Sequence, residues 1–166
     1  MKRALIICFA VFLLMQFIRP EKVQYSDDET YEIVLPSDIK EIFVRACYDC
    51  HSNKINYPWY SNVAPFSWVV ANHTNEGVNA LNFSNWEKYT QTQKNEKLKA
   101  IYRTAHSSMP LPAYTWAHIE AELSKEDREK NFSDFFNQKL IVDDLNNSID
   151  TIDGFIKSKL SKKKVI

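Results

Sequence analysis

The pentapeptide Cys47-Tyr48-Asp49-Cys50-His51 organises the rest of this chain. Two thiols three positions apart, followed directly by an imidazole, are the spacing by which proteins attach a c-type haem, with the histidine as proximal iron ligand. On one turn of helix both sulfurs can reach the porphyrin edge while the adjacent ring lies beneath the iron. The motif therefore predicts one covalent haem c per chain, bound by Cys47, Cys50 and His51, with His51 as a metal ligand.

Three other uses of this cysteine pair remain open. A zinc site needs a second ligand pair at similar spacing, and the only other cysteine, Cys8, lies in an apolar N-terminal run. A thioredoxin-like dithiol needs a helix that opens at the first cysteine, whereas here a helix is expected to end near the motif. A structural disulfide is feasible in an oxidising compartment, but it is strained across two intervening residues.

The residues before the motif predict a helix whose buried face leads to the cysteines. Pro36 and Ser37 mark its start. Apolar residues then recur at the spacing of one helix face, at Ile39, Ile42, Phe43, Ala46 and Cys50. Both cysteines are therefore expected on a core-facing surface, which suits an apolar haem ring.

Aromatic residues and prolines are dense after the motif. Residues 57–60 read Tyr-Pro-Trp-Tyr, and residues 65–68 read Pro-Phe-Ser-Trp. Large flat side chains such as Trp59 and Trp68 can cover a porphyrin, so both are candidate cofactor-binding residues. An ordinary aromatic core is the alternative for each ring.

Two further helices are expected before the next proline-rich loop. The second helix begins near residue 65, and His73 lies on its apolar face. A capping box at Ser84 and Glu87 predicts a third helix that ends near His106. His106 and His118 lie in polar surroundings and are expected at the surface.

The sixth iron ligand has two candidates. Met109 stands between a serine pair and Pro110, in a loop that breaks helicity. Many c-type cytochromes present a methionine sulfur from such a stiff loop. His73 has an ordinary alternative role as a hydrogen-bonded core residue. We therefore predict that Met109, rather than His73, is the second metal ligand, while both are expected at the cofactor.

Four segments together resemble the bacterial haem-binding domain family, small envelope proteins with one CxxCH site. They are CYDCHSN at 47–53, YPWYSNVAPFSWVVANHTNEG at 57–77, LNFSNW at 81–86 and SMPLPAY at 108–114. The resemblance covers about residues 38–128. It implies an all-α, cytochrome c-like domain around one covalent haem, with Cys47 and Cys50 as attachment points and His51 as an axial ligand. Beyond Ser124 the chain departs from the family's short final helix.

The N-terminal residues form a signal-type segment. Lys2 and Arg3 precede the apolar run 4–18, which Arg19 and Pro20 close. Because no small-x-small cleavage site follows, we expect an uncleaved anchor over residues 1–20, which is short for a transmembrane span. The positive charges keep the N-terminus in the cytoplasm. The expected location is the bacterial inner membrane with the domain facing the periplasm; a soluble periplasmic protein after signal cleavage is the alternative.

The chain is expected to divide into four parts. Residues 1–20 are the anchor, 21–35 a polar tether, 36–130 the haem-binding domain, and 131–166 a C-terminal helical extension with a basic tail. The extension carries apolar residues every three to five positions from Phe132 to Leu160. We expect one or two helices that pack on the domain.

Composition sets limits on function. The 166 residues carry zero formal net charge, so nothing points to nucleic acid, and the two glycines argue against a phosphate-cradling loop. The leading hypothesis is an electron carrier that meets redox partner proteins of the cell envelope. The alternative is a haem enzyme, or a sensor of a small ligand, whose sixth position is open or lined by His73.

Overall fold

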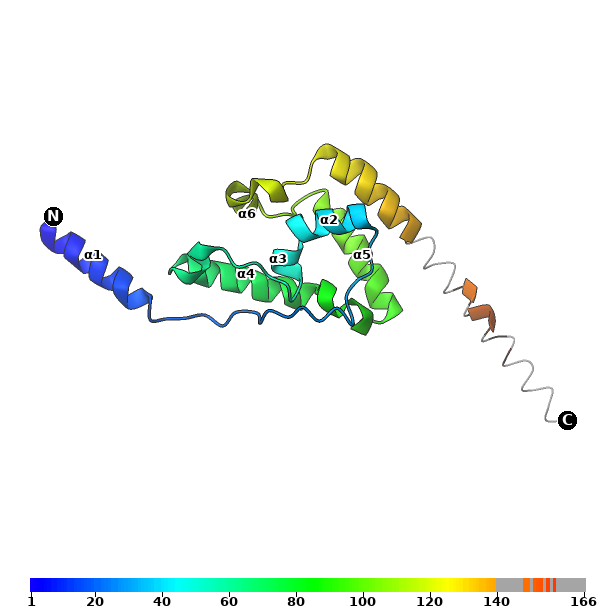
Figure 1. Ribbon diagram of the computed structural model, residues 1–166, viewed down its shortest axis with the longest axis horizontal. Helices are drawn as coiled ribbons and strands as arrows, with labels where there is room; N and C mark the ends of the chain where they lie inside the picture. Colours follow the sequence, from blue (N-terminus) through cyan, green and yellow to red (C-terminus); the bar gives the residue numbers. More distant parts are fainter. Residues whose placement is uncertain (140–147, 150, 154, 156, 158–166) are drawn as a thin grey trace.

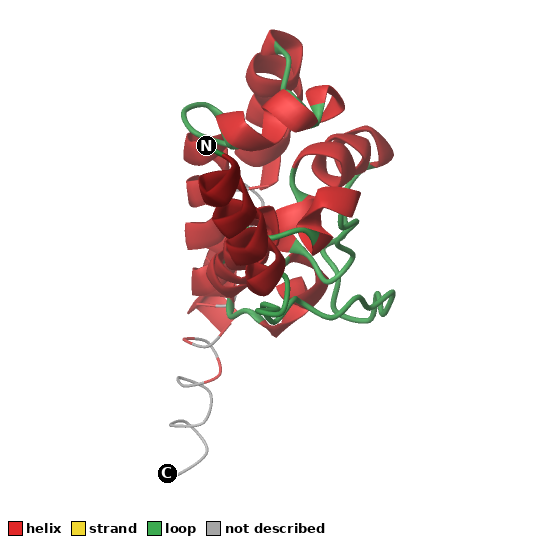
Figure 2. Ribbon diagram, turned by 90° about the vertical axis from the view of Figure 1, so that its left-hand side faces the viewer, coloured by secondary structure: helices red, strands yellow, loops and turns green. Residues whose placement is uncertain are grey.

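The computed structural model describes residues 1–139, 148–149, 151–153, 155 and 157, and within them every regular element is helical, as predicted (Figures 1 and 2). The α-helices are α1 (Lys2–Met15), α2 (Ser37–Ala46), α3 (Tyr48–His51), α4 (Phe66–Ala80), α5 (Gln91–Ala105) and α6 (Pro112–Ala117). Shorter 3-10 turns are η1 (Trp59–Asn62), η2 (Phe83–Lys88) and η3 (Ile119–Ala121). The last segment, η4 (Asp127–Phe132), is the π-helical part of a helix over residues 125–139.

The core forms around the predicted face of α2. Ile39, Ile42, Phe43 and Ala46 are all buried. Phe43 is fully buried, and its ring centroid lies 5.0 Å from that of Phe83 and 5.6 Å from that of Phe132. Such tilted and edge-to-face pairs add to the free energy gained from burying apolar area. This packing fixes the end of α2 from which the cysteine motif continues.

The cysteine motif does not continue α2 but forms its own turn. Cys47 has φ −127°, which ends α2, and α3 follows at once. The turn packs on α4, so the two thiols and His51 lie between α2 and α4. The short helix therefore presents the motif at the junction of two longer ones.

The start of the third predicted helix differs from the expectation. Ser84 and Glu87 lie in η2, whose first turn is capped by the side chain of Asn82. The non-helical φ and ψ of Asn85 keep this turn from growing into a helix. The complete capping box is that of Thr90 and Gln93, and α5 starts there and ends at Ala105, close to the predicted end.

The helix over residues 125–139 packs into the core of the domain. Ser124 and Asp127 cap it reciprocally, at 2.8 and 3.0 Å. Phe132 and Phe136 are buried against Phe43, so the domain extends past the expected boundary at 130. Of the other predicted apolar positions, Phe135 packs against the same core, whereas Ile149 and Ile152 are exposed. The rest, Leu140, Ile141, Leu145, Ile156 and Leu160, and the basic tail 162–164 lie outside the described residues.

Arg45 of α2 holds the chain that follows α6. Its guanidinium donates to the carbonyl oxygens of Glu120 and Glu122, at 2.8 and 2.9 Å, and to Asp127 Oδ2 at 2.6 Å. The Arg45 guanidinium thereby binds two backbone carbonyl oxygens of the loop and the carboxylate that caps the helix over residues 125–139. The C-terminal part of the domain is fastened next to the cysteine motif.

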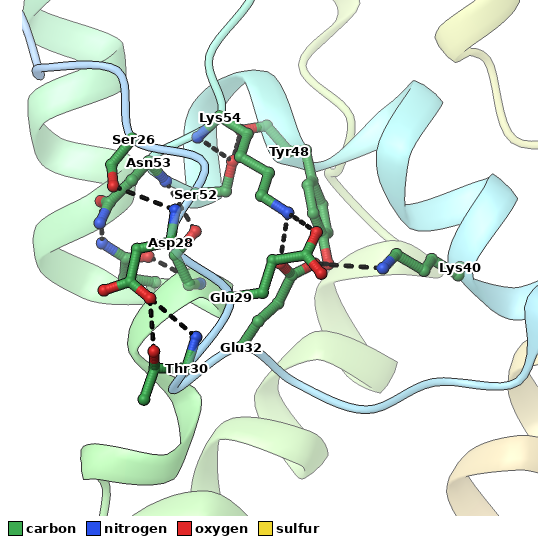
Figure 3. Close-up of polar contacts among 12 residues, drawn as sticks. Ser26, Asp28, Glu29, Thr30, Glu32, Lys40, Tyr48, Ser52, Asn53 and Lys54 are labelled. Carbon is green, nitrogen blue, oxygen red and sulfur yellow. Dashed lines mark hydrogen bonds and ion pairs between the residues drawn. The ribbon is translucent and has the colours of Figure 1, made fainter.

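Residues 21–35 were expected to be a free tether, but they pack along the domain. The backbone N–H of Ser26 donates to the Asn53 carbonyl at 2.8 Å, and that of Ile33 donates to the Phe83 carbonyl at 2.9 Å. Buried Glu32 accepts from Tyr48 at 2.9 Å and pairs with Lys54, as Figure 3 shows. These polar residues make specific contacts, which composition alone could not reveal.

The helix α1 projects from one end of the domain (Figure 1). Its 14 residues include no buried one. No helix in the described part of the chain is both long and apolar enough to cross a membrane.

Candidate functional site: a cavity beside the cysteine motif

A cavity of about 470 Å³ lies between α3, α4, α5 and the loop before α6. This volume falls in the range of about 300–1,000 Å³ typical of small-molecule and cofactor sites. Its lining is mostly apolar, with a few polar groups. It includes Cys47, Cys50, His51, His73, Met109, Leu111 and Phe132. Helices far apart in sequence therefore enclose one site around the motif.

The two thiols of the motif are partly buried and free. Burial raises the pKa of Cys47 to about 12 and that of Cys50 to about 11. A redox dithiol has the opposite property, because its nucleophilic thiol needs a lowered pKa. The described residues also hold no group of three or more His, Cys, Asp and Glu that could hold a metal ion. The raised pKa values therefore argue against a reactive dithiol at this site.

The His51 ring is oriented by the end of α4. Its Nδ1 lies 3.0 Å from the carbonyl oxygen of Gly77 and 3.2 Å from that of Leu81. Carbonyl oxygens only accept, so Nδ1 carries the proton and Nε2 keeps its lone pair. Burial lowers the pKa of His51, although the two carbonyls act in the opposite direction. The neutral ring is thus in the tautomer that a metal ligand requires.

Gly77 allows α4 to approach the motif closely. A Cβ at this position would lie 2.9 Å from the carbonyl carbon of Cys50 and closer still to its oxygen. Only a residue without a side chain fits, and this contact brings the Gly77 carbonyl to His51. The close packing of α4 on the cysteine motif and the orientation of the His51 ring therefore both depend on Gly77.

Met109 is placed in the cavity by the end of α5. Its backbone N–H donates to the Thr104 carbonyl at 2.8 Å, and its own carbonyl accepts from Arg128 at 3.4 Å. The side chain lines the same cavity as His51. The structure thus brings together the two residues that the sequence singled out as axial ligands.

Of the other three candidate residues, one lines the cavity and two do not. His73 lines the cavity, and it lies one turn before Gly77 on α4. Trp59 and Trp68 do not line it, which corrects their expected role as a porphyrin cover. Trp59 is 79 % exposed, and the Trp68 indole donates to the carbonyl of Ile18 at 2.9 Å.

Sequence reasoning missed a polar network at the cavity. Tyr114 donates to Asp49 at 2.7 Å, and its ring stacks on that of His118 at 4.4 Å. His118 Nε2 lies 2.9 Å from the Tyr60 hydroxyl. His118 was expected at the surface, but its side chain is only 18 % exposed. In the sequence, only the position of Asp49 inside the cysteine motif pointed to this network. The pairing of Asp49 with Tyr114 depends on the tertiary fold.

A helical domain with a mainly apolar cavity, two partly buried free thiols and a neutral histidine with one free ring nitrogen has the features of a haem pocket. The sequence model of the family described as "Haem-binding domain" matches residues 10–137. The chain belongs to this family and is a haem-binding protein. No curated protein and no solved structure matched it.

Proposed function

We propose that this protein is a membrane-attached c-type haem protein that carries electrons in the cell envelope. The observation that carries the proposal is the orientation of His51, whose Nδ1 is held by two backbone carbonyls while the ring lines the cavity. In metal sites, such a contact fixes the tautomer and the ring orientation of the ligating histidine. The haem would supply reversible Fe(II)/Fe(III) redox chemistry, and the chain would hold, orient and shield it.

Covalent attachment is supported by the placement of both thiols. Cys47 and Cys50 flank one turn, line the cavity and are free to form thioethers with the two vinyl groups of one haem. Cys8 lies on α1 and is exposed, away from the cavity lining. The proposal is therefore one haem c per chain.

The arrangement of the ligands favours Met109 as the sixth ligand. His73 projects from the helix whose last turn holds His51, so it shares a wall with the proximal side. Met109 comes from the separate loop after α5. Met109 would therefore hold the haem iron together with His51, each from a different wall of the cavity, and the haem would supply reversible electron transfer there.

A haem enzyme or a small-ligand sensor is the second candidate. The observation in its favour is that His73 lines the cavity, where its imidazole could serve as an acid or base toward a bound small ligand. This function requires a sixth position that is open in solution. The coordination state of the purified protein separates the two candidates.

Attachment to the inner membrane, with the domain facing the periplasm, is proposed through α1. The helix exposes Leu5, Ile6, Phe9 and Leu14, and two cationic residues stand at its start. A short apolar helix is accommodated by local thinning of the bilayer and by snorkelling of flanking cations. Redox partner proteins of the envelope would then meet the domain at the membrane.

Haem staining after denaturing gel electrophoresis tests the attachment. The wild type and Cys8→Ser should stain equally, whereas Cys47→Ser with Cys50→Ser should lose the stain. The Cys8 variant is the matched control because it removes a thiol outside the cavity. A wild-type haem that acid and acetone extract from the protein would refute covalent binding.

A further inference from the structure

We propose that one end of the domain rests on the lipid surface around α1, with Trp59, Phe66 and Trp116 at the level of the lipid headgroups. This end consists of η1, the start of α4, and the segment from α6 to η3. The proposal rests on the membrane attachment of α1 proposed above. It adds that the domain does not stand off from the membrane but is seated on it in a fixed orientation.

The first argument is that no free chain separates α1 from the domain. Gln16, the residue directly after α1, exchanges two hydrogen bonds with the backbone of buried Ala64, at 2.9 and 3.3 Å. Arg19 donates to the Asn62 carbonyl at 2.9 Å, and Trp68 donates to the Ile18 carbonyl at 2.9 Å. A helix held in the bilayer would therefore hold this end of the domain at the bilayer surface.

The following residues extend this attachment. Lys22 Nζ donates to Ser61 and to Asn62, each at 3.0 Å. Asn75 of α4 donates to the carbonyl of Glu21 at 2.9 Å. The segment that could have served as a flexible spacer is thus fastened along α4, and Figure 1 shows it running beside that helix.

The second argument is the chemistry of this end. Trp59 is 79 % exposed, Phe66 60 %, Trp116 87 % and Ile119 77 %. Tyr60 joins the first two, since its ring centroid lies 5.9 Å from that of Trp59 and 6.4 Å from that of Phe66. Exposed aromatic side chains that gather in this way mark a docking surface.

The segment from α6 to η3 is connected to η1 by side-chain contacts. The Tyr60 hydroxyl bonds His118, which directly precedes η3, and the α6 residue Tyr114 stacks on the same imidazole. Figure 1 shows α6 and the start of α4 at the end of the domain nearest α1. The segments that carry these exposed aromatic residues therefore lie together at one end of the domain.

Lipid is the occupant that fits this face. Tryptophan is enriched at the membrane–water boundary, where its apolar ring and its N–H group both find partners. Arg19 and Lys22, in the segment that follows α1, would supply positive charge at the level of anionic headgroups. A protein partner would need no such placement, whereas α1 brings this face to the lipid directly.

The test uses the full-length haem protein in nanodiscs of phosphatidylcholine and phosphatidylglycerol. Hydroxyl-radical oxidation, read by mass spectrometry, compares Trp59, Phe66 and Trp116 with Tyr25, which is 66 % exposed. We expect each of the first three to be oxidised several-fold more slowly than its exposure relative to Tyr25 implies. Oxidation in proportion to exposure would overturn the proposal.

Vesicle flotation separates this inference from the function on which it rests. Wild-type protein that does not float with vesicles of the same lipids would refute the attachment of α1 and the seating together. Protein that floats, but whose Trp59 is oxidised like Tyr25, would refute the seating alone. Haem staining is read independently of both results.

A variant provides the second measurement. Trp59→Ser with Phe66→Ser should still float, but linear dichroism of the haem band in oriented bilayers should fall at least two-fold, because the domain loses its fixed tilt. The control Val34→Ser changes a residue that is 84 % exposed before α2 and should keep the wild-type dichroism. Equal dichroism in wild type and double variant would overturn the proposal.

Discussion

The Tyr114 hydroxyl donates a 2.7 Å hydrogen bond to Asp49 Oδ2, and this bond ties α6 to the turn that carries both cysteines. Asp49 also accepts from the backbone N–H of Asn56 at 3.0 Å. Burial, followed by the hydrogen bond to Asp49, raises the pKa of Tyr114. The phenol therefore remains a donor at neutral pH, and it links the segments that contain His51 and Met109.

Replacing Tyr114→Phe should lower the free energy of unfolding by about 1–3 kcal/mol, the range for a hydrogen bond to a charged group. Urea unfolding of the haem-loaded protein measures this change. Tyr25→Phe removes an exposed phenol and should stay within about 0.5 kcal/mol of wild type. Equal stability of the two variants would show that the Asp49 contact contributes nothing.

Replacing Gly77→Ala should lower the free energy of unfolding by about 1–3 kcal/mol, because the added methyl group meets the Cys50 carbonyl. The shift of α4 should also move its carbonyl away from His51 and change the haem spectrum. Asn79→Ala, at an exposed position of the same helix, is the control for helix propensity. An unchanged spectrum in Gly77→Ala would show that ring orientation does not depend on this contact.

Replacing Met109→Ala should abolish the long-wavelength sulfur-to-iron absorption of the oxidised protein and lower its reduction potential. Thioether ligation favours Fe(II) relative to imidazole ligation, so its loss stabilises Fe(III). His73→Ala should leave both properties nearly intact. The reverse pattern would indicate a bis-histidine haem, and no change in either variant would indicate an open sixth site and favour the enzyme or sensor.

The carboxylate of Glu32 should make stability depend on pH. Burial acts to raise its pKa, but hydrogen bonds from Lys54 and Tyr48 outweigh burial and hold the pKa below its ordinary value. A lowered pKa in the folded state contributes stability above the unfolded value of about 4.3, and this contribution is lost as the pH falls through the folded value.

Urea unfolding between about pH 7 and pH 3 should therefore show a smaller acid-induced loss for Glu32→Gln than for wild type. At neutral pH the variant should be less stable by about 1–3 kcal/mol, because Lys54 keeps Glu29 but loses the buried carboxylate of its two charged partners. Glu41→Gln removes an exposed carboxylate of α2 and should follow the wild-type pH profile. Parallel profiles for all three proteins would contradict the role of Glu32.

Local patterns predicted the motif and the helix that leads to it. The face of α2 was predictable because Ile39, Ile42, Phe43 and Ala46 follow helical spacing, and burial of that face follows from hydrophobicity. Met109 was also predictable as a cavity residue, since a proline-flanked thioether after a haem motif has few other uses. In both places the residues of one short stretch are sufficient to predict where their side chains lie.

Long-range contacts were not predictable in this way. Trp59 and Tyr60 are neighbours with similar side chains, yet Tyr60 lines the cavity and Trp59 faces away. Their opposite placement is set by η1, whose packing against α4 depends on residues elsewhere. Glu32 likewise looked like part of a polar linker. In the fold its carboxylate is buried, pairs with Lys54 and accepts a hydrogen bond from Tyr48.

The walls of the cavity appear in a definite order along the chain, from Cys47 in the N-terminal half to Phe132 near the end of the domain. Cys47, Cys50 and His51 come from the first half of the domain, whereas α5, Met109 and Phe132 come from the second half. The pocket is therefore complete only in a chain that extends through Phe132. A chain that ended before the helix over residues 125–139 would leave one wall of the cavity missing beside His51.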